Sequence, residues 1–384
     1  MNKVTAIACA GLMALGSCNK PPVSALAFSV CPALGPVSGN TITQEFPAGG
    51  PNGMFQPAWQ VSFGYATAKG LYITGASFRQ KPTDPWMRVL YDARLSDIFV
   101  PYHSGSPRYY DLSGFSFNLV DATAADAGPC GRILGGKVVN QIDQSQLLWK
   151  ADTGVRYANE MLLWGTLGAA NYNYIMRYGF RDDGTITLRI GATSHNLPGR
   201  PFEAHMHDGL WRIDMDLNGS ATDSPFWMVH TEPSGLATQA SDSMSAFNGG
   251  IEGSQVWNAL QFNHVLVQDQ TKTNGRGDKI SYEYMPVRMG RAVHNEAFSK
   301  ADFWVTPYNS AEMKYSDITT YMTGQPIMNT DVVVWHMSPL HHLPRDEDGF
   351  VNGGYWDGVA LVMWGGIDLK PRNLWDRTPL YPNN

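Results

Sequence analysis

Short runs rich in β-branched and aromatic residues, separated by turn-forming residues, follow one another from Trp59 almost to the end of the chain. Examples are WQVSFGY, TITLRIGA, FWVTPY and DVVVWHM. Such runs are typical of strands, because branched and aromatic side chains pack well on a pleated surface. Tight-hairpin signals occur at residues 181–184 (RDDG) and 217–220 (LNGS), so the strands should be mainly antiparallel. Only residues 155–163 suggest a helix.

The charge balance excludes two classes of protein. The chain has 28 basic and 34 acidic residues, which gives 28 − 34 = −6. A nucleic-acid binder needs an excess of basic groups, and a disordered acidic chain needs far more charge than 16%. With 39 Gly and 24 Pro in 384 residues, the composition predicts a globular, turn-rich chain rather than a coiled coil.

The first residues resemble a secretory leader. Lys3 is followed by a mostly apolar run over residues 4–16, too short to span a bilayer. We expect a leader over residues 1–27 that is cleaved after the small-residue site at 25–27, and a secreted, periplasmic or extracellular product. The alternative is a lipobox at 15–18, which would leave a lipidated Cys18 and membrane anchoring. Cleavage after residue 27 removes two lysines, so the mature charge would be 26 − 34 = −8.

Two cysteines remain beyond the leader, Cys31 and Cys130. In an oxidising compartment they could form one disulfide, or they could be two buried thiols, and the sequence leaves both open. Residues 28–58 are rich in Gly, Pro, Ser and Thr, which predicts an irregular segment. Residues 59–384 are expected to form one β domain.

Histidines at three places along the chain are candidate metal ligands. His205 and His207 are two apart on an expected strand, so their side chains point to the same face. His341 and His342 are adjacent and face opposite ways in an extended segment, so at most one of them can join the same site. Imidazoles suit copper or zinc rather than calcium. The alternative interpretation is strand histidines without a metal.

Four segments, in this order along the chain, resemble the catalytic domain of the copper-containing, quinone-dependent amine oxidases. They are DIFVPYHSGSPRYYDLSG, ANYNY, EAHMHDGLWRIDMDLNG, and the pair DFWVTPY and DVVVWHMSPLHHLPRDED. The resemblance covers residues 59 to about 374. It implies one large antiparallel β-sandwich.

The resemblance also implies a role for each matching residue. Tyr172 is the expected precursor of topaquinone, with Asn171 beside it. The remaining roles would be copper ligands for His205, His207 and His342, catalytic base for Asp111, hydroxyl partner of the quinone for Tyr102, and substrate entrance for Tyr109. A second, structural ion such as calcium would bind Asp214, the Met215 carbonyl, Asp216 and Asp331.

The implied reaction is oxidative deamination of a primary amine by oxygen, which gives an aldehyde, hydrogen peroxide and ammonia. Two other readings stay open: a catalytically impaired copper-binding relative, or a pathway enzyme that acts on an unusual amine. The resemblance further implies a homodimer with hairpin arms, for which residues 268–279 are the best candidate tip. No nucleic-acid partner is expected, and a membrane only if Cys18 is lipidated.

Some residues depart from the family pattern. Asn173 replaces an acidic residue after the quinone tyrosine, which would remove a negative charge beside the cofactor. Gly168 stands where Ser or Thr is usual, Met337 and Pro339 where Thr and a small residue are usual, and Phe350 in place of a proline. The small N-terminal domains of the family have no counterpart, so we expect essentially the catalytic domain. These differences bear on substrate class and turnover more than on the copper site.

Overall fold

The computed structural model describes most of the chain beyond residue 30. The described residues are 31–49, 54–151, 154–194, 199–200, 202–232, 241–258, 261–287, 290–292, 294–345, 351–352, 355–356 and 363–378. The expected leader, both of its processing sites, Cys18 and Phe350 lie outside them. The chain divides into two compact units, residues 1–32 and 33–384, and the second contains every strand discussed below. Within the described ranges, no helix has the length and apolar character needed to cross a bilayer.

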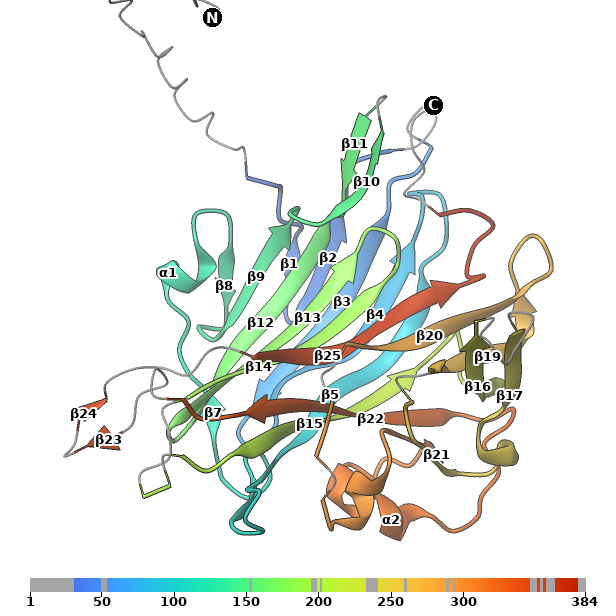
Figure 1. Cartoon of the computed structure of the whole chain (residues 1–384). Helices are drawn as coiled ribbons and strands as arrows, with labels where there is room; N and C mark the ends of the chain where they lie inside the picture. The colour runs from blue at the N-terminus through green and yellow to red at the C-terminus, as the bar shows by residue number, and fades with distance from the viewer. Residues whose placement is uncertain are drawn as a thin grey trace, which may run out of the picture. The chain divides into compact units, whose positions relative to one another are not determined.

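Two large antiparallel sheets make up the second unit (Figure 1). The first sheet has the order β1 (Val37–Ser38), β2 (Thr41–Glu45), β3 (Ala58–Ala66), β4 (Gly70–Arg79), β5 (Met87–Pro101), β15 (His205–Met215), β22 (Val332–His342), β21 (Phe303–Pro307), β18 (Gly253–Gln255), with β6 (Arg108–Tyr110) paired to β5. The second has the order β17 (Ser241–Ala246), β16 (Asp223–Thr231), β19 (Phe262–Thr273), β20 (Lys279–Val287), β25 (Met363–Arg372), β14 (Ile186–Ser194), β13 (Tyr172–Arg181), β12 (Glu160–Ala169), β9 (Val138–Asp143), β8 (Arg132–Leu134), with β7 (Asn118–Leu119) paired to β12.

The remaining elements are short. They are the hairpins β10 (Leu147–Ala151) with β11 (Gly154–Tyr157) and β23 (Val351–Asn352) with β24 (Tyr355–Trp356), the helices α1 (Ala124–Ala127) and α2 (Ile318–Tyr321), and the 3₁₀ turns η2 (Phe247–Gly250), η3 (Ala297–Lys300) and η4 (Tyr315–Asp317). The prediction of an all-β, antiparallel sandwich is therefore confirmed.

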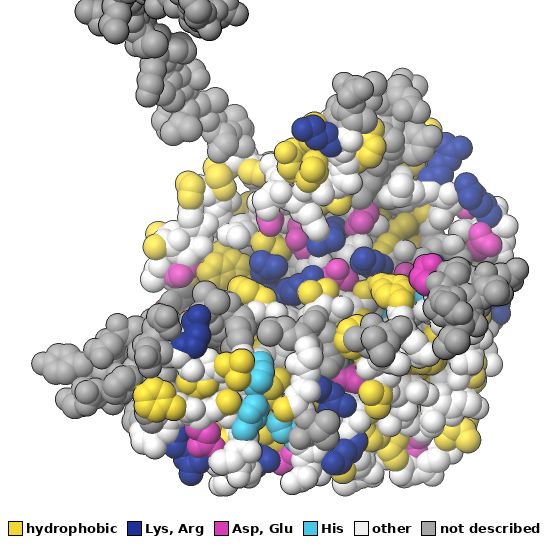
Figure 2. All heavy atoms as spheres, viewed as in Figure 1, with side chains coloured by type: hydrophobic (Ala, Val, Ile, Leu, Met, Phe, Trp, Pro, Cys, Tyr) yellow, Lys and Arg dark blue, Asp and Glu magenta, His cyan; other side chains and the backbone are white. Residues whose placement is uncertain are grey.

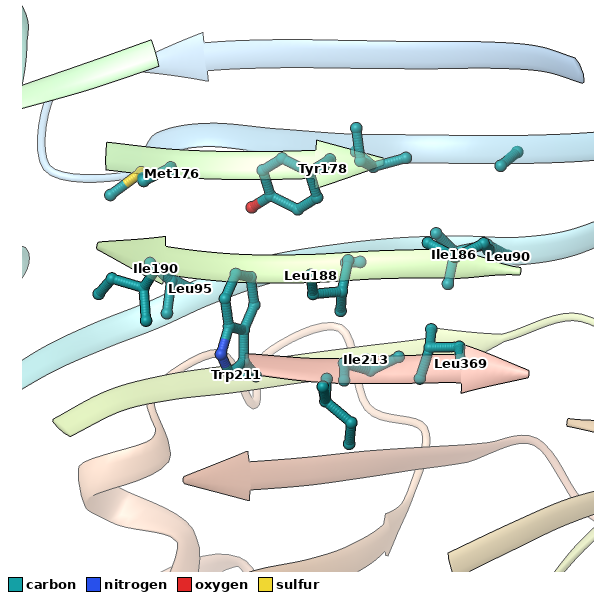
Figure 3. Close-up of a cluster of buried hydrophobic side chains, with 14 of the residues drawn as sticks. Leu90, Leu95, Met176, Tyr178, Ile186, Leu188, Ile190, Trp211, Ile213 and Leu369 are labelled. Carbon is teal, nitrogen blue, oxygen red and sulfur yellow. The ribbon is translucent and has the colours of Figure 1, made fainter. Parts of the chain in front are cut away.

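The core lies between the two sheets. Leu188 and Ile190 of β14 and Trp211 and Ile213 of β15 are fully buried and belong to one apolar cluster (Figure 3). The Trp211 ring meets the ring of Tyr178 on β13 edge to face, with centroids 5.9 Å apart, which joins the sheets directly. Burial of each such aliphatic side chain contributes roughly 1.5–3 kcal/mol. This apolar packing fixes the position of one sheet against the other.

Two of the expected hairpins form. Residues 181–184 connect β13 to β14, and the amide of Arg181 donates to the carbonyl of Thr185 at 2.9 Å. The segment 268–279 forms the end of the β19–β20 hairpin, where the amide of Asn274 donates to Asp278 O at 2.9 Å. Arg276-Gly277-Asp278 is therefore part of a turn.

The prediction of a hairpin at residues 217–220 is wrong. The turn exists, with positive φ at Asn218 (62°) and Gly219 (119°), but it connects strands of different sheets. β15 pairs with β5 and β22, whereas β16 pairs with β17 and β19. Asn and Gly signal a reversal of the chain, and they carry no information about which strand pairs next.

Three other predictions can be compared with the structure. Residues 155–157 belong to β11 and residues 160–163 to β12, with no helix between them, because β12 is central in its sheet and pairs on both sides. The expected irregular segment 28–58 contains β2, where buried Ile42 and Gln44 alternate with more exposed neighbours. Cys31 and Cys130, whose pairing the sequence left open, are both disulfide-bonded.

Candidate metal and active site

Three histidines from two neighbouring strands meet between the sheets. His205 and His207 lie on β15, and His342 is the last residue of β22. The strand register places His342 directly opposite His205, whereas His341 lies opposite Met206 and so faces the other side of the sheet. One ligand atom from each of His205, His207 and His342 lies within 4.8 Å of the others. The structure thus brings together the three predicted ligands and separates His341 from them.

Hydrogen bonds orient two of these imidazoles toward a shared centre. His205 Nδ1 donates to the carbonyl of Glu203 at 2.9 Å, which leaves the lone pair on Nε2. His207 Nδ1 lies 2.8 Å from the Tyr174 hydroxyl, and its buried Nε2 has no hydrogen-bond partner in the protein. Burial lowers the pKa of His205 to about 3 and the pKa of His207 well below its usual value. Neutral, oriented imidazoles with a buried free nitrogen are what a bound metal requires, so this set fits copper.

Tyr172 reaches the histidines from the opposite sheet. It is the first residue of β13, and its hydroxyl lies 2.5 Å from His205 Nε2 and 3.5 Å from His342 Nδ1. Tyr102 follows β5, hydrogen-bonds Tyr172 through its side chain, and stacks on the His205 ring at 4.3 Å. Burial raises the pKa of Tyr102 to about 12, which keeps its hydroxyl protonated as a donor.

Asp111 is connected to the histidines through Tyr174. The Tyr174 hydroxyl donates to Asp111 Oδ2 at 2.5 Å and accepts from His207 Nδ1 at 2.8 Å. Burial raises the pKa of Asp111 to about 7, while the hydrogen bond from Tyr174 acts in the opposite direction. A carboxylate with a pKa near neutrality is an effective proton acceptor, unlike an aspartate in water.

Asp111 and Tyr172 line the same pocket. It has a volume of about 230 Å³, and its lining consists of Val100, Tyr102, Tyr109, Asp111, Phe115, Phe117, Ala169, Ala170, Asn171 and Tyr172. Tyr109 and Asn171 are thus at the pocket, as expected. Among these lining residues Asp111 is the only carboxylate, and the rest are mostly apolar or aromatic. Such a lining places one carboxylate among mostly apolar walls.

The expected second ion site is less well formed. Asp214 is buried, and its pKa is raised to about 8 by burial and then by the charge of Asp331. Arg212 Nη1 lies 3.7 Å from Asp214 Oδ2 and offsets part of the charge. Within the described ranges, the three histidines are the only group of three or more His, Cys, Asp or Glu side chains whose ligand atoms converge, so Asp214, Asp216 and Asp331 do not form a comparable cluster.

Two of the departures from the family pattern, Asn173 and Met337, are not part of the pocket lining. Asn173 is exposed and, as the residue after Tyr172 on β13, points to the other face of the sheet. Its replacement of an acid therefore takes no charge from the pocket. Met337 is fully buried in an apolar cluster with Leu210 and Trp335, so it acts in packing.

The carboxyl-terminal half of the chain matches a known family model. Residues 200–382 match the model described as copper amine oxidase, enzyme domain, and they include all three histidines. The chain is related to the copper amine oxidases.

The relatives are distant, but they align over most of the chain. Primary amine oxidase 2 of Arabidopsis thaliana is 22% identical over 84% of this chain and 57% of its own length, and the primary amine oxidase of Klebsiella aerogenes is 24% identical over 54% of this chain. Among solved structures, the Aspergillus nidulans amine oxidase superposes with a TM-score of 0.66 at 17% identity, covering 92% of this chain and 57% of the other. A copper-containing benzylamine oxidase from Hansenula polymorpha gives 0.64 at 17% identity. The chain thus spans less than two thirds of the length of these curated relatives.

Sequence reasoning missed Tyr174. Its signal was available, because residues two apart on a strand share a face, so Tyr174 had to accompany Tyr172 into the space between the sheets. Its contact with both Asp111 and His207 could not be derived, because those residues come from other strands.

Proposed function

We propose that this protein is a primary-amine oxidase that uses copper and a topaquinone formed from Tyr172. It would convert a primary amine, oxygen and water to an aldehyde, ammonia and hydrogen peroxide. The observation that supports this best is the Tyr172 hydroxyl, which contacts two of the three clustered histidines on one side of the pocket that Asp111 lines. The proposal includes export from the cytoplasm and a homodimer.

The chain's own residues have distinct tasks in this reaction. His205, His207 and His342 would hold copper, which with the quinone supplies the oxidising power and passes electrons to oxygen. Asp111 accepts the proton from the carbon that carries the amine. Tyr102 donates a hydrogen bond to the oxygen on the ring at position 172. The aromatic pocket walls exclude water, which strengthens both interactions.

Tyr172→Phe tests the proposal directly. Copper-loaded wild-type protein is expected to give a positive redox-cycling stain with nitroblue tetrazolium, and the variant none, because phenylalanine lacks the oxygen from which the quinone forms. Tyr284→Phe is a matched control, since this buried tyrosine has a hydroxyl without a hydrogen-bond partner. A wild type that binds copper but does not stain would favour the catalytically impaired relative.

The pH dependence should report Asp111. Only the ionised carboxylate accepts a proton, and burial raises its pKa to about 7, so kcat/KM should fall as the pH drops below that value. Tyr174→Phe should move the inflection to higher pH, because the hydrogen bond from Tyr174 lowers the pKa of Asp111. Titration of the substrate amine affects both proteins equally. Tyr178→Phe, on the same face of β13 but bonded to Leu71 O, should leave the inflection in place, and an unmoved inflection in Tyr174→Phe would contradict the assignment.

The pocket lining predicts the kind of amine. An aromatic monoamine such as benzylamine should exceed 1,4-diaminobutane in kcat/KM by at least about fivefold, because even a neutral polar group left unpaired among apolar walls costs about 1–3 kcal/mol and an ammonium ion costs more. Peroxide release with both amines measures the ratio. Phe115 is 42% exposed, so Phe115→Glu should fold normally and shift the ratio toward the diamine. Equal rates in the wild type would show that the second ammonium lies outside this pocket.

A further inference from the structure

Three side chains with metal-binding atoms lie on the face of the first sheet that is turned away from the copper ligands. The β15–β22 register places Met206 opposite His341, so the two side chains are neighbours on one face. The rings of His341 and His103 are 5.0 Å apart between centroids, within the 4.6–6.1 Å range of the three copper-ligand rings. His341 and His103 are therefore as close to each other as the three clustered histidines are.

The backbone explains how His103 reaches this position. Tyr102 bridges to His205, and the amide of His103 donates to the carbonyl of Ala204 at 3.0 Å, so the ladder between β5 and β15 continues past the end of β5. Tyr102 therefore faces the copper ligands, and His103 faces the same side as Met206.

The exposure of these groups suits uptake of an ion from solvent. His103 is exposed, His341 is partly exposed with a buried Nε2 that has no hydrogen-bond partner, and Met206 is fully buried. Asp208 follows on the same face, and its carboxylate lies 3.8 Å from His294 Nε2. Figure 2 shows histidine side chains gathered in one patch at the lower left of the face in view.

We propose that His103, His341 and Met206 form a second metal site that binds Cu(I). A thioether is a soft ligand that favours Cu(I), and imidazole accepts copper readily, whereas a hard ion such as calcium would find no suitable oxygen among these three groups. This site is distinct from the three-histidine site, which lies on the opposite face of the same strands. The choice of copper as the natural ion rests on the proposed function. The preference of these three ligands for a soft ion is independent of that function.

Silver(I) tests the site in the copper-loaded protein. Silver has the same charge and closed shell as Cu(I) and does not change oxidation state, and X-ray absorption at the silver edge sees only silver. We expect one sulfur and two nitrogen scatterers. Met206→Leu, a change that conserves volume, should lose the sulfur scatterer. Met337→Leu, at another fully buried methionine, is the matched control and should keep it. A spectrum without sulfur in the wild type, or sulfur that persists in Met206→Leu, would overturn the proposal.

Affinity gives a second measurement. In anaerobic competition with a Cu(I) chelator, His103→Ala and His341→Ala should each weaken Cu(I) binding at least about 10-fold. Loss of a residue that only hydrogen-bonds a metal ligand already weakens metal binding by about that factor, and loss of a ligand should cost at least as much. Unchanged affinity in both variants would also overturn the site. The quinone stain separates this inference from the proposed function. Silver bound to sulfur in a protein that does not stain would support the second site and reject the oxidase. A protein that stains but binds no silver through sulfur would support the oxidase and reject the second site.

Discussion

Asp111→Asn is expected to lower kcat about 10²- to 10⁴-fold, the range that a positioned general base contributes. The amide cannot accept the proton, yet it has nearly the same shape and can still accept the hydrogen bond from Tyr174. Copper content, quinone staining and thermal stability should therefore stay close to those of the wild type. Steady-state oxygen consumption, corrected for the quinone content of each preparation, measures the loss.

A second buried aspartate provides the control for this variant. Asp182 lies in the turn after β13, at the other end of that strand from Tyr172. Burial raises its pKa to about 6, and its carboxylate accepts a hydrogen bond from the side chain of Asn159. Asp182→Asn removes a comparable buried charge without touching the pocket, so kcat should be unchanged. If Asp111→Asn kept full activity per quinone, another group would have to accept the proton.

His207→Ala is expected to weaken copper binding by more than about 100-fold. Removal of a residue that only hydrogen-bonds a metal ligand weakens metal binding by up to about that factor, and removal of a ligand itself should cost more. His207 is fully buried, and its Nε2 is the free nitrogen directed to the shared centre. Without copper, the ring at position 172 should stay an ordinary tyrosine, so staining and amine oxidation should both be lost. Copper content after dialysis and the mass of the peptide containing Tyr172 are the measurements.

His341→Ala is the informative comparison for the copper site. His341 is next to His342 in the chain, but its side chain is on the opposite face of β22, so Cu(II) at the three-histidine site and quinone formation should be retained. Thermal unfolding of both metal-free variants would separate a lost ligand from a lost fold. Full copper retention in a folded His207→Ala protein would show that this histidine is not a ligand.

Local chemistry in the sequence predicted a large part of the site, but not its assembly. Alternation along a strand was enough to put His205 and His207 on one face. It could not choose between His341 and His342, because the choice depends on the register of β22 against a strand more than a hundred residues earlier. The resemblance to a family supplied that choice, and the register of His205 opposite His342 gives its physical reason.

The errors in the fold have the same origin. Residues 217–220 carry a correct turn signal, but the partner of the next strand is decided by packing across the core. Residues 155–163 suggest a helix, but residues 155–157 pair with β10, and residues 160–163 pair with β13 and β9 on both sides. Propensity acts over a few residues, and pairing between distant segments overrides it.

The three clustered histidines come from one sheet and Tyr172 from the other, so their contact depends on how the apolar layer between the sheets positions one sheet against the other. The cofactor would thus form only in molecules whose two sheets had packed together in the correct relative position. A chain that folded with its sheets slightly displaced could keep its strands and its histidines and would still not form the quinone. Cofactor formation would therefore depend on a correct tertiary structure, and because the modification of the ring is covalent, it would persist after that structure had formed.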